Sequence, residues 1–168
     1  VLLGIKPQPV AELDSPPRIG FCRTHVWSVT EPYTKVLLED AAAALARAGA
    51  TVKDITLPAE FEQIEDAHRW ISGFEFARNF SWELEHHAES ISRRLRNGRI
   101  KDGLECSYEQ YIKARDFAEK CRAAFPACFD DCDVLLTVAA TGEAPVGTNS
   151  TGNVAPSFIW TTVHAPSI

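Results

Sequence analysis

The densest cluster of possible metal ligands lies in one short segment, which holds Glu83, Glu85, His86, His87 and Glu89. Imidazoles and carboxylates one helical turn apart can share a metal ion, and Glu83 and His87 have that spacing. The order differs from the H-E-x-x-H zinc pattern, however, and the cluster falls on the polar side of a predicted helix. We therefore interpret it as a solvated charged face, and we predict neither a metal nor any other cofactor.

A thiol nucleophile is the second candidate, because Cys128 and Cys132 lie one helical turn apart just before a predicted strand. Such a nucleophile needs a positioned histidine, and the sequence places none nearby. The neighbouring Asp130, Asp131 and Asp133 disfavour a thiolate. The chain has five cysteines and no C-x-x-C pair, which fits neither a disulfide framework nor a zinc site. We predict that the cysteines are reduced and mostly pack in the core.

Two further ionisable residues, His68 and Glu75, lie close to an apolar stripe with helical spacing. Each would need a hydrogen-bond partner if buried, so we predict structural roles for both. A Ser-His-Asp arrangement stays open, because its members need not be close in sequence. The chain contains no G-x-S-x-G elbow and no phosphate-cradling glycine pattern. The residues alone thus show no complete catalytic set.

A long loop is the most distinctive feature of the sequence. After a predicted strand the chain runs through AATGEAPVGTNSTGN, residues 139–153, with no helical or strand period. Loops of this length in a compact domain are usually binding sites or linkers. Small residues let a ligand approach the backbone closely. The alternative is a solvent-exposed connection without a ligand.

Composition limits the partners that the chain can have. The net charge is -6 and the pI is about 5.4, which argues against nucleic-acid binding. One basic cluster is the exception, and we interpret it as a solvated helix end. Its members are Arg93, Arg94, Arg96, Arg99 and Lys101. No stretch approaches the roughly 18 apolar residues of a membrane span, and no signal peptide is recognisable, so we predict no membrane contact and a cytoplasmic location.

The elements that must position these residues alternate between strand and helix. Strands are predicted near residues 18–23, 51–57 and 133–138. A helix with Thr30 as N-cap and Gly49 as C-terminal cap lies between the first two strands. This spacing suits a parallel crossover and predicts an α/β fold, with part of a mixed β-sheet flanked by helices.

The remaining segments read mainly as helices. Residues 59–96 predict one long helix or two joined by a kink, and residues 155–163 a short helix. Ser107 and Gln110 form a capping box at the start of a further helix. Four prolines in residues 1–17 indicate a connecting segment, and residues 18–168 form the rest.

The order of these motifs resembles the C-terminal half of the amidase signature enzymes. The segments that carry the resemblance are PRIGFCRT, YTKVLLEDAAAALARAGATVKDITLP, YEQYIKARDFAEKCRAAFPACFDDCDVLLTVAATGEAP and STGNVAPSFIWTTVHAPSI. The family typically shows PRIG, a helix and strand ending in LP, D-x-L-L-T-P followed by AP, a helix with WT, and G-x-P. This chain departs from it at Val138, where proline is usual, and at His164 and Ala165, where glycine and a small or apolar residue are usual.

The resemblance implies that residues 18–168 form the C-terminal portion of an amidase-like domain, and that catalysis depends on residues outside this chain. The family's Ser nucleophile, cis-Ser and Lys lie N-terminal to a stretch like residues 1–20, so no catalytic residue is assigned here. The chain begins with Val and has no Met, and we expect it to be a segment of a longer protein. Its N-terminal half is then the expected partner, docked on an uncovered apolar face. Self-association into a homo-oligomer is the alternative use of that face.

The implied function is hydrolysis of a carboxylic amide, or transfer of its acyl group, with a small-molecule amide as substrate. The isolated chain should lack this activity. In the family the long loop borders the substrate site, and we predict substrate contacts at Thr137, Thr141, Ser150, Thr151 and Trp160. The alternative function is a non-catalytic α/β binding or assembly module. A Gly/Ser-rich signature encoded upstream of Val1, with a Lys well before it, would distinguish the enzyme from the module.

Overall fold

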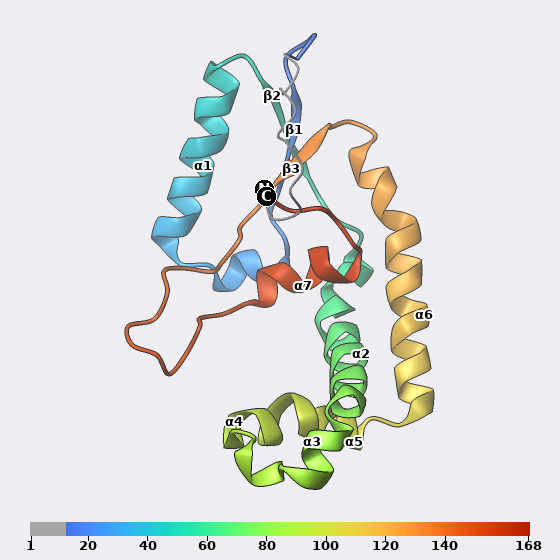
Figure 1. Cartoon of the computed structure of the whole chain (residues 1–168). Coiled ribbons are helices and arrows are strands. Elements are labelled where there is room, and N and C mark those ends of the chain that lie inside the picture. Colours follow the sequence, from blue (N-terminus) through green and yellow to red (C-terminus); the bar gives the residue numbers. More distant parts are fainter. Residues whose placement is uncertain (1–12) are drawn as a thin grey trace, which may run out of the picture.

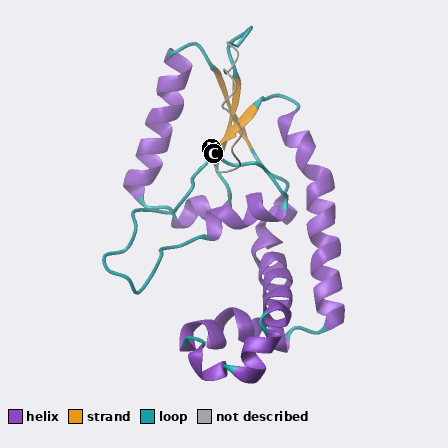
Figure 2. Cartoon of the chain, in the orientation of Figure 1, coloured by secondary structure: helices purple, strands orange, loops and turns teal. Residues whose placement is uncertain are grey.

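The fold is a small parallel sheet enclosed by helices. A computed structural model describes residues 13–168; most of the predicted connecting segment 1–17 lies outside the described residues. The strands are β1 (Arg18–Cys22), β2 (Thr51–Ile55) and β3 (Val134–Leu136), in the order β2-β1-β3. Figure 1 and Figure 2 show the three strands side by side in the upper part of the molecule, with a long helix on either side. The predicted α/β class and strand positions are confirmed, and all strand pairs among the described residues are parallel.

Helix α1 (Pro32–Arg47) makes the crossover between β1 and β2. The two strands pair in parallel from Arg18 opposite Thr51 to Cys22 opposite Ile55. Gly49 has φ +106°, the left-handed conformation that ends a helix, as predicted. The prediction for Thr30 is wrong, because the cap position belongs to the next residue. The Thr30 hydroxyl instead donates to the Val26 carbonyl at 2.9 Å, across a 3-10 helix, His25–Val29.

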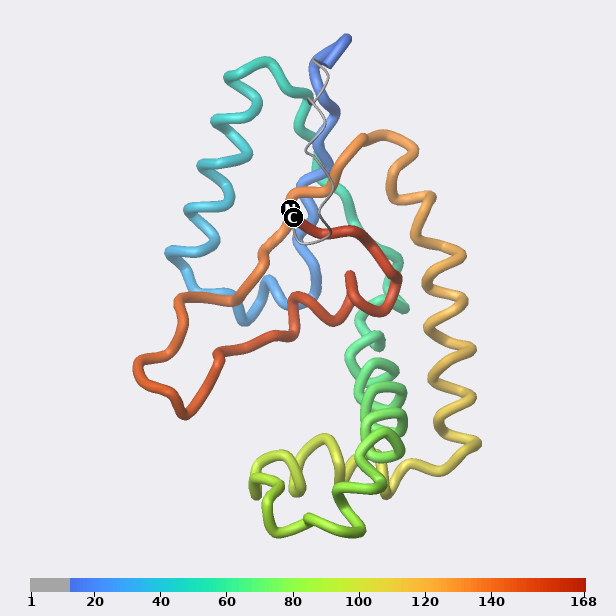
Figure 3. Tube along the Cα trace, viewed as in Figure 1, coloured from blue at the N-terminus to red at the C-terminus, as the bar shows by residue number. Residues whose placement is uncertain are grey.

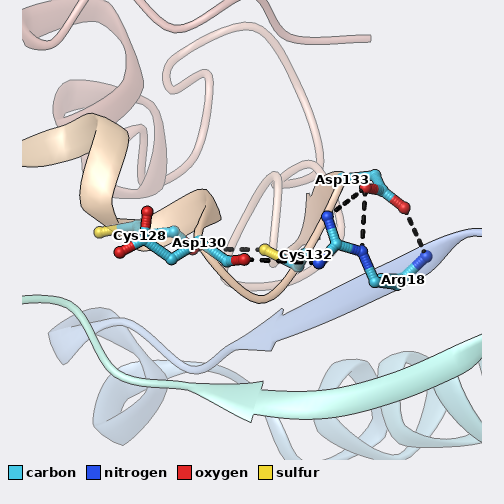
Figure 4. Close-up of polar contacts among 5 residues, drawn as sticks. All are labelled: Arg18, Cys128, Asp130, Cys132 and Asp133. Carbon is cyan, nitrogen blue, oxygen red and sulfur yellow. Dashed lines mark hydrogen bonds and ion pairs between the residues drawn. The ribbon is translucent and has the colours of Figure 1, made fainter.

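The register of β3 against β1 is held by one ion pair, drawn in Figure 4. Asp133 Oδ2 accepts from the Arg18 backbone N–H at 2.8 Å, and Oδ1 accepts from Arg18 Nη2 at 2.7 Å. The Asp133 N–H in turn donates to the Arg18 carbonyl at 2.8 Å. These hydrogen bonds keep the pKa of the Asp133 carboxyl below its ordinary value.

The predicted helical region 59–96 is divided into several pieces. A 3-10 helix, Ala59–Gln63, leads into α2 (Ile64–Asn79), which ends at Phe80. Four further pieces lead to the next helix: α3 (Ser81–His86), a 3-10 turn (Ala88–Ser90), α4 (Arg93–Leu95) and a kinked turn (Arg96–Ile100). Helix α5 (Lys101–Glu105) then packs back against α2. Only glycine fits the crossing, since a Cβ at Gly103 would lie 1.9 Å from the Gly73 carbonyl oxygen.

Helices α6 (Tyr108–Ala124) and α7 (Ala155–Thr162) complete the main core. Ser107 Oγ accepts from the Gln110 N–H at 3.1 Å, so Ser107 caps α6 as the predicted capping box requires on one side. One apolar cluster joins these helices to the start of α2. Its buried members are Phe61, Ile64, Cys121, Phe125, Ile159 and Val163. The buried residues of α6 have helical spacing and form one face: Tyr111, Ala114, Ala118 and Cys121.

An apolar surface is left open on α1. Tyr33, Val36 and Leu37 have exposed fractions of 50%, 56% and 69%, while Ala42 is the one buried residue of this helix. Val134 in β3 is also 50% exposed, and one edge of β3 has no strand beside it among residues 13–168. The chain thus exposes apolar side chains of the kind that a partner usually covers.

Candidate functional site

The long loop between β3 and α7 is tied to two distant parts of the chain. Figure 3 shows it running outward from the sheet and returning to α7. At the start of α1, the Glu31 N–H donates to the Thr141 carbonyl at 2.8 Å, and Tyr33 Oη accepts from the Glu143 N–H at 2.6 Å. Farther along, Arg94 of α4 donates to the Asn149 carbonyl at 2.5 Å. These contacts give the loop a defined path.

Two glycines allow that path. A Cβ on Gly142 would lie 2.8 Å from both Tyr33 Oη and Glu31 Cγ, so a larger residue would push the loop off α1. Gly152 has φ +85°, which L-residues with side chains rarely adopt. The small residues noted in the sequence are therefore needed for close packing and for turning.

The loop and the start of α1 enclose a cavity of about 510 Å³, which we call the loop pocket. Thr141 and Thr151 line it from the loop, and Glu31 and Tyr33 line it from the α1 side. Glu143 adds a second carboxylate, and no lysine, arginine or histidine is among the lining residues. Hydroxyls, carboxylates and loop backbone can orient a polar neutral group such as an amide.

The five predicted substrate-contact residues fall in different places. Thr141 and Thr151 line the loop pocket together. Ser150, Thr137 and Trp160 are not among its lining residues, and Ser150 Oγ accepts from the Gly152 N–H at 3.2 Å. The Trp160 ring packs against the main core, 6.1 Å from the Phe125 ring. The substrate contacts of all five residues stay a prediction.

Five buried polar atoms have no hydrogen-bond partner among the described residues. They are the hydroxyls of Thr24, Thr137 and Thr162, the indole nitrogen of Trp160 and Oε2 of Glu83. Thr24 and Thr137 follow the carboxyl ends of the adjacent strands β1 and β3. Ligands of α/β proteins commonly bind outside these strand ends. Sequence analysis missed Thr24 and Thr162, although the place of Thr24 just after a predicted strand was a usable signal.

The cysteines do not supply a reactive thiol. Burial raises the pKa of Cys22 to about 12, and it also raises the pKa values of Cys128 and Cys132. Cys132 Sγ donates to the Cys128 carbonyl at 3.3 Å, visible in Figure 4. Protonated, hydrogen-bonded thiols of this kind are poor nucleophiles.

The acidic and histidine-rich segment around α3 is not arranged as a metal site. Between residues 13 and 168, no group of three or more His, Cys, Asp or Glu side chains could hold an ion. His86 Nδ1 lies 2.9 Å from the Trp82 carbonyl, and its ring stacks on Trp82. Among residues 13–168, no helix is long and apolar enough to cross a membrane.

Glu75 and His68 have different surroundings. Glu75 accepts a hydrogen bond from Tyr111 Oη at 2.8 Å, which is the structural role predicted for it. His68 is half-buried, and its ring stacks on Phe158 at 4.4 Å. Burial and the nearby charge of Arg99 lower the pKa of His68, so its imidazole is neutral at pH 7. It lines a second cavity, apart from the loop pocket.

Comparison with known proteins identifies the family. The amidase family model matches residues 6–166. This chain belongs to the amidase family. A curated relative from Comamonas testosteroni, 2-amino-5-chloromuconic acid deaminase, is 28% identical over 130 residues, which are 76% of this chain and 28% of that protein. The chain therefore spans about a quarter of the length of this relative.

Solved structures share the fold of this amidase chain. A crystal structure of an amidase matches 92% of the chain and 36% of its own length, with a TM-score of 0.74 and 21% identity. A vestigial protein complex tied to the evolutionary origins of an s-triazine catabolic enzyme matches 87% of the chain and 32% of its own length. Its TM-score is 0.69 and its identity 23%. At these identities the likeness concerns the fold alone.

One departure from the family pattern has a visible structural consequence. His164 stands where glycine is usual, and it has φ +59°, the left-handed conformation. It follows α7 in a Schellman arrangement, in which the Ala165 N–H donates to the Trp160 carbonyl at 2.9 Å. Glycine is favoured at this position because it has no Cβ to clash, so the amidase pattern has a local physical reason.

Proposed function

We propose that the protein containing this chain cleaves a carboxylic amide C–N bond, or transfers its acyl group, through a serine nucleophile. The serine, a cis-serine and a lysine would come from residues outside the chain, as the family pattern implies. The observation that carries the proposal is the family match over residues 6–166. The curated relative is named as a deaminase of 2-amino-5-chloromuconic acid, which also points to cleavage of a C–N bond.

The part played by this chain would be to hold the substrate. The loop pocket offers the hydroxyls of Thr141 and Thr151. None of its lining residues is cationic, so the pocket suits a neutral amide better than an anionic group. In the proposed enzyme these hydroxyls orient the amide, while the missing half supplies nucleophile, base and oxyanion donors.

The second part of the proposal concerns the missing half itself. The exposed face of α1, formed by Tyr33, Val36 and Leu37, would be covered by the rest of the protein. The open edge of β3 would continue into further strands there. An exposed apolar face next to an unpaired strand edge is a liability in an isolated domain, and a docked neighbour removes both features.

The test is to compare the 168-residue chain with the product of a coding sequence extended upstream of Val1. We expect the extended protein to release ammonia from simple amides such as benzamide, and to be labelled at a serine by a fluorophosphonate. The chain alone should do neither, because the family pattern places the nucleophile and its base in residues outside the chain. An extended protein with no Gly/Ser-rich signature and no turnover would instead support the non-catalytic module.

Within the extended protein, Thr141→Val tests the loop pocket. Removal of one substrate hydrogen bond should raise KM about fivefold to tenfold and leave kcat nearly unchanged. Thr161→Val is the matched control, because Thr161 is exposed on α7 and does not line the loop pocket. Equal effects of the two substitutions would argue against substrate contact at Thr141.

A further inference from the structure

A second cavity of about 510 Å³ lies along α2, and we call it the α2 cavity. Residues of α2 form one wall, the chain from Arg99 to Asp102 forms another, and Phe158 of α7 closes a third side. It shares no lining residue with the loop pocket. Neither the family match nor the loop pocket gives this cavity a role.

The two ends of the α2 cavity differ in charge. Glu62, Glu65 and Asp66 lie at the N-terminal end of α2, where carboxylates are stabilised by the helix dipole. All three are exposed and need no ligand to account for them. In the middle, Arg69 and Asp102 form an ion pair at 2.5 Å and neutralise each other.

The other end carries a cation, Arg99, that forms no ion pair with a carboxylate of residues 13–168. The Arg99 backbone packs against α2 at Gly73, because a Cβ built on Gly73 would lie 3.4 Å from the Arg99 carbonyl oxygen. The Arg99 side chain is exposed, and its guanidinium lies 5.8 Å from the centroid of the Phe76 ring. An unpaired guanidinium at a cavity wall is suited to a planar oxyanion.

Three other residues that line or border this end of the α2 cavity also suit a planar oxyanion. His68 is one turn from Ser72 on the same face of α2, and its neutral imidazole can donate one hydrogen bond. The Ser72 hydroxyl reaches only the Arg69 carbonyl, at a long 3.5 Å, and can turn toward a ligand. Phe158 stacks on His68 and adds an apolar aromatic surface beside the donors.

We propose that the end of the α2 cavity formed by His68, Ser72, Arg99 and Phe158 binds the carboxylate of a small planar organic acid. Arg99 makes the charged contact, His68 and Ser72 add single hydrogen bonds, and the apolar body of the acid lies toward Phe158. This binding does not depend on the proposed amide hydrolysis.

Three ligands of nearly equal shape test the proposal by isothermal titration calorimetry on the 168-residue chain. Benzoate is anionic, benzamide is neutral and benzamidine is cationic. We expect benzoate to bind at least tenfold more tightly than the other two, because a charge-assisted hydrogen bond to Arg99 distinguishes it. Benzoate should also shift the ring resonances of His68 and leave those of His25 unchanged.

Substitutions separate this site from general surface charge. Arg99→Gln should weaken benzoate binding about tenfold or more, and Arg99→Lys should retain part of it. Arg93→Gln is the matched control, because Arg93 is exposed on α4 and does not line the α2 cavity. Tighter binding of benzamidine, or equal loss in the Arg93 and Arg99 variants, would overturn the proposal. None of these binding measurements requires amide turnover, so a negative result would reject the carboxylate site without rejecting the proposed hydrolase.

Discussion

Helices α1 and α2 are both sixteen residues long and both have apolar residues with helical spacing, yet they differ sharply in burial. Helix α2 buries Ile64, Ala67, Gly73, Phe74 and Ala77. Helix α1 buries only Ala42, and its largest apolar side chains face solvent. An apolar stripe therefore shows which face of a helix seeks cover, but it does not show whether the same chain provides that cover.

The difference between the two helices assigns them different tasks. Helix α2 packs against α5, α6 and α7, so it holds the described fold together and forms the wall of the α2 cavity. Helix α1 contacts mainly β2, and its first turn supports the loop pocket. Substitutions in α2 should act on stability, and substitutions on the outer face of α1 should act on association.

The largest expected effect comes from truncating matched residues in the two helices. Ile64→Ala removes a side chain that is 0% exposed, and it should lower the free energy of unfolding by about 3 kcal/mol. Leu37→Ala removes one that is 69% exposed, and it should change that energy by less than about 0.5 kcal/mol. Urea unfolding followed by circular dichroism measures both. Similar losses in the two variants would mean that α1 is covered in solution, for example by a second copy of the chain.

The next effect tests what covers α1. Leu37→Asp should leave the unfolding energy of the chain nearly unchanged, because the side chain is exposed. It should weaken binding of a separately produced upstream half about tenfold or more, since a charge would be buried in an apolar interface. Glu39→Gln, on the same helix, is the control substitution. Undiminished binding of the upstream half by the Asp variant would place the docking surface elsewhere.

A smaller effect concerns the ion pair that sets the register of β3. The pKa of Asp133 is lowered in the folded state by its hydrogen bonds to Arg18, so this contact stabilises the fold above the unfolded-state pKa of about 3.9. That stability is lost as the pH falls through the lower, folded-state pKa. The unfolding energy of the wild type should therefore fall more steeply between about pH 4 and pH 2 than that of Asp133→Asn. Parallel curves for the two proteins would show that the contact adds nothing to stability.

Sequence reasoning succeeded where the controlling interactions are local. The capping box at Ser107 and the turn at Gly49 depend on neighbours a few residues away, and both were predicted. The breaks at Phe80 and His87 were not, because packing of α5 against α2 decides where the helical region bends. The spacing of apolar residues therefore predicts that a helix exists better than it predicts where the helix ends.

The two cavities show the same limit at the level of sites. Thr141 and Thr151 could be found because they lie on one recognisable loop. His68, Phe158 and Arg99 line one cavity although they lie 31 or more positions apart on separate elements, and no sequence pattern predicts that they come together. An uncovered apolar face was expected from the family resemblance, but the sequence did not place it on α1, whose helical pattern alone would have predicted burial.

The smallest expected effect, and the one with the sharpest local control, is at the end of α7. His164 is exposed with φ +59°, a conformation that is unfavourable by roughly 1–2 kcal/mol for a residue with a Cβ. His164→Gly removes that strain but gains about 0.5–1 kcal/mol of unfolded-chain entropy, so we expect a net stabilisation of about 0.5 kcal/mol. His164→Ala keeps the Cβ and should give no such gain. Thermal unfolding of the three proteins measures the difference, and a more stable alanine variant would contradict the assignment of left-handed strain to this position.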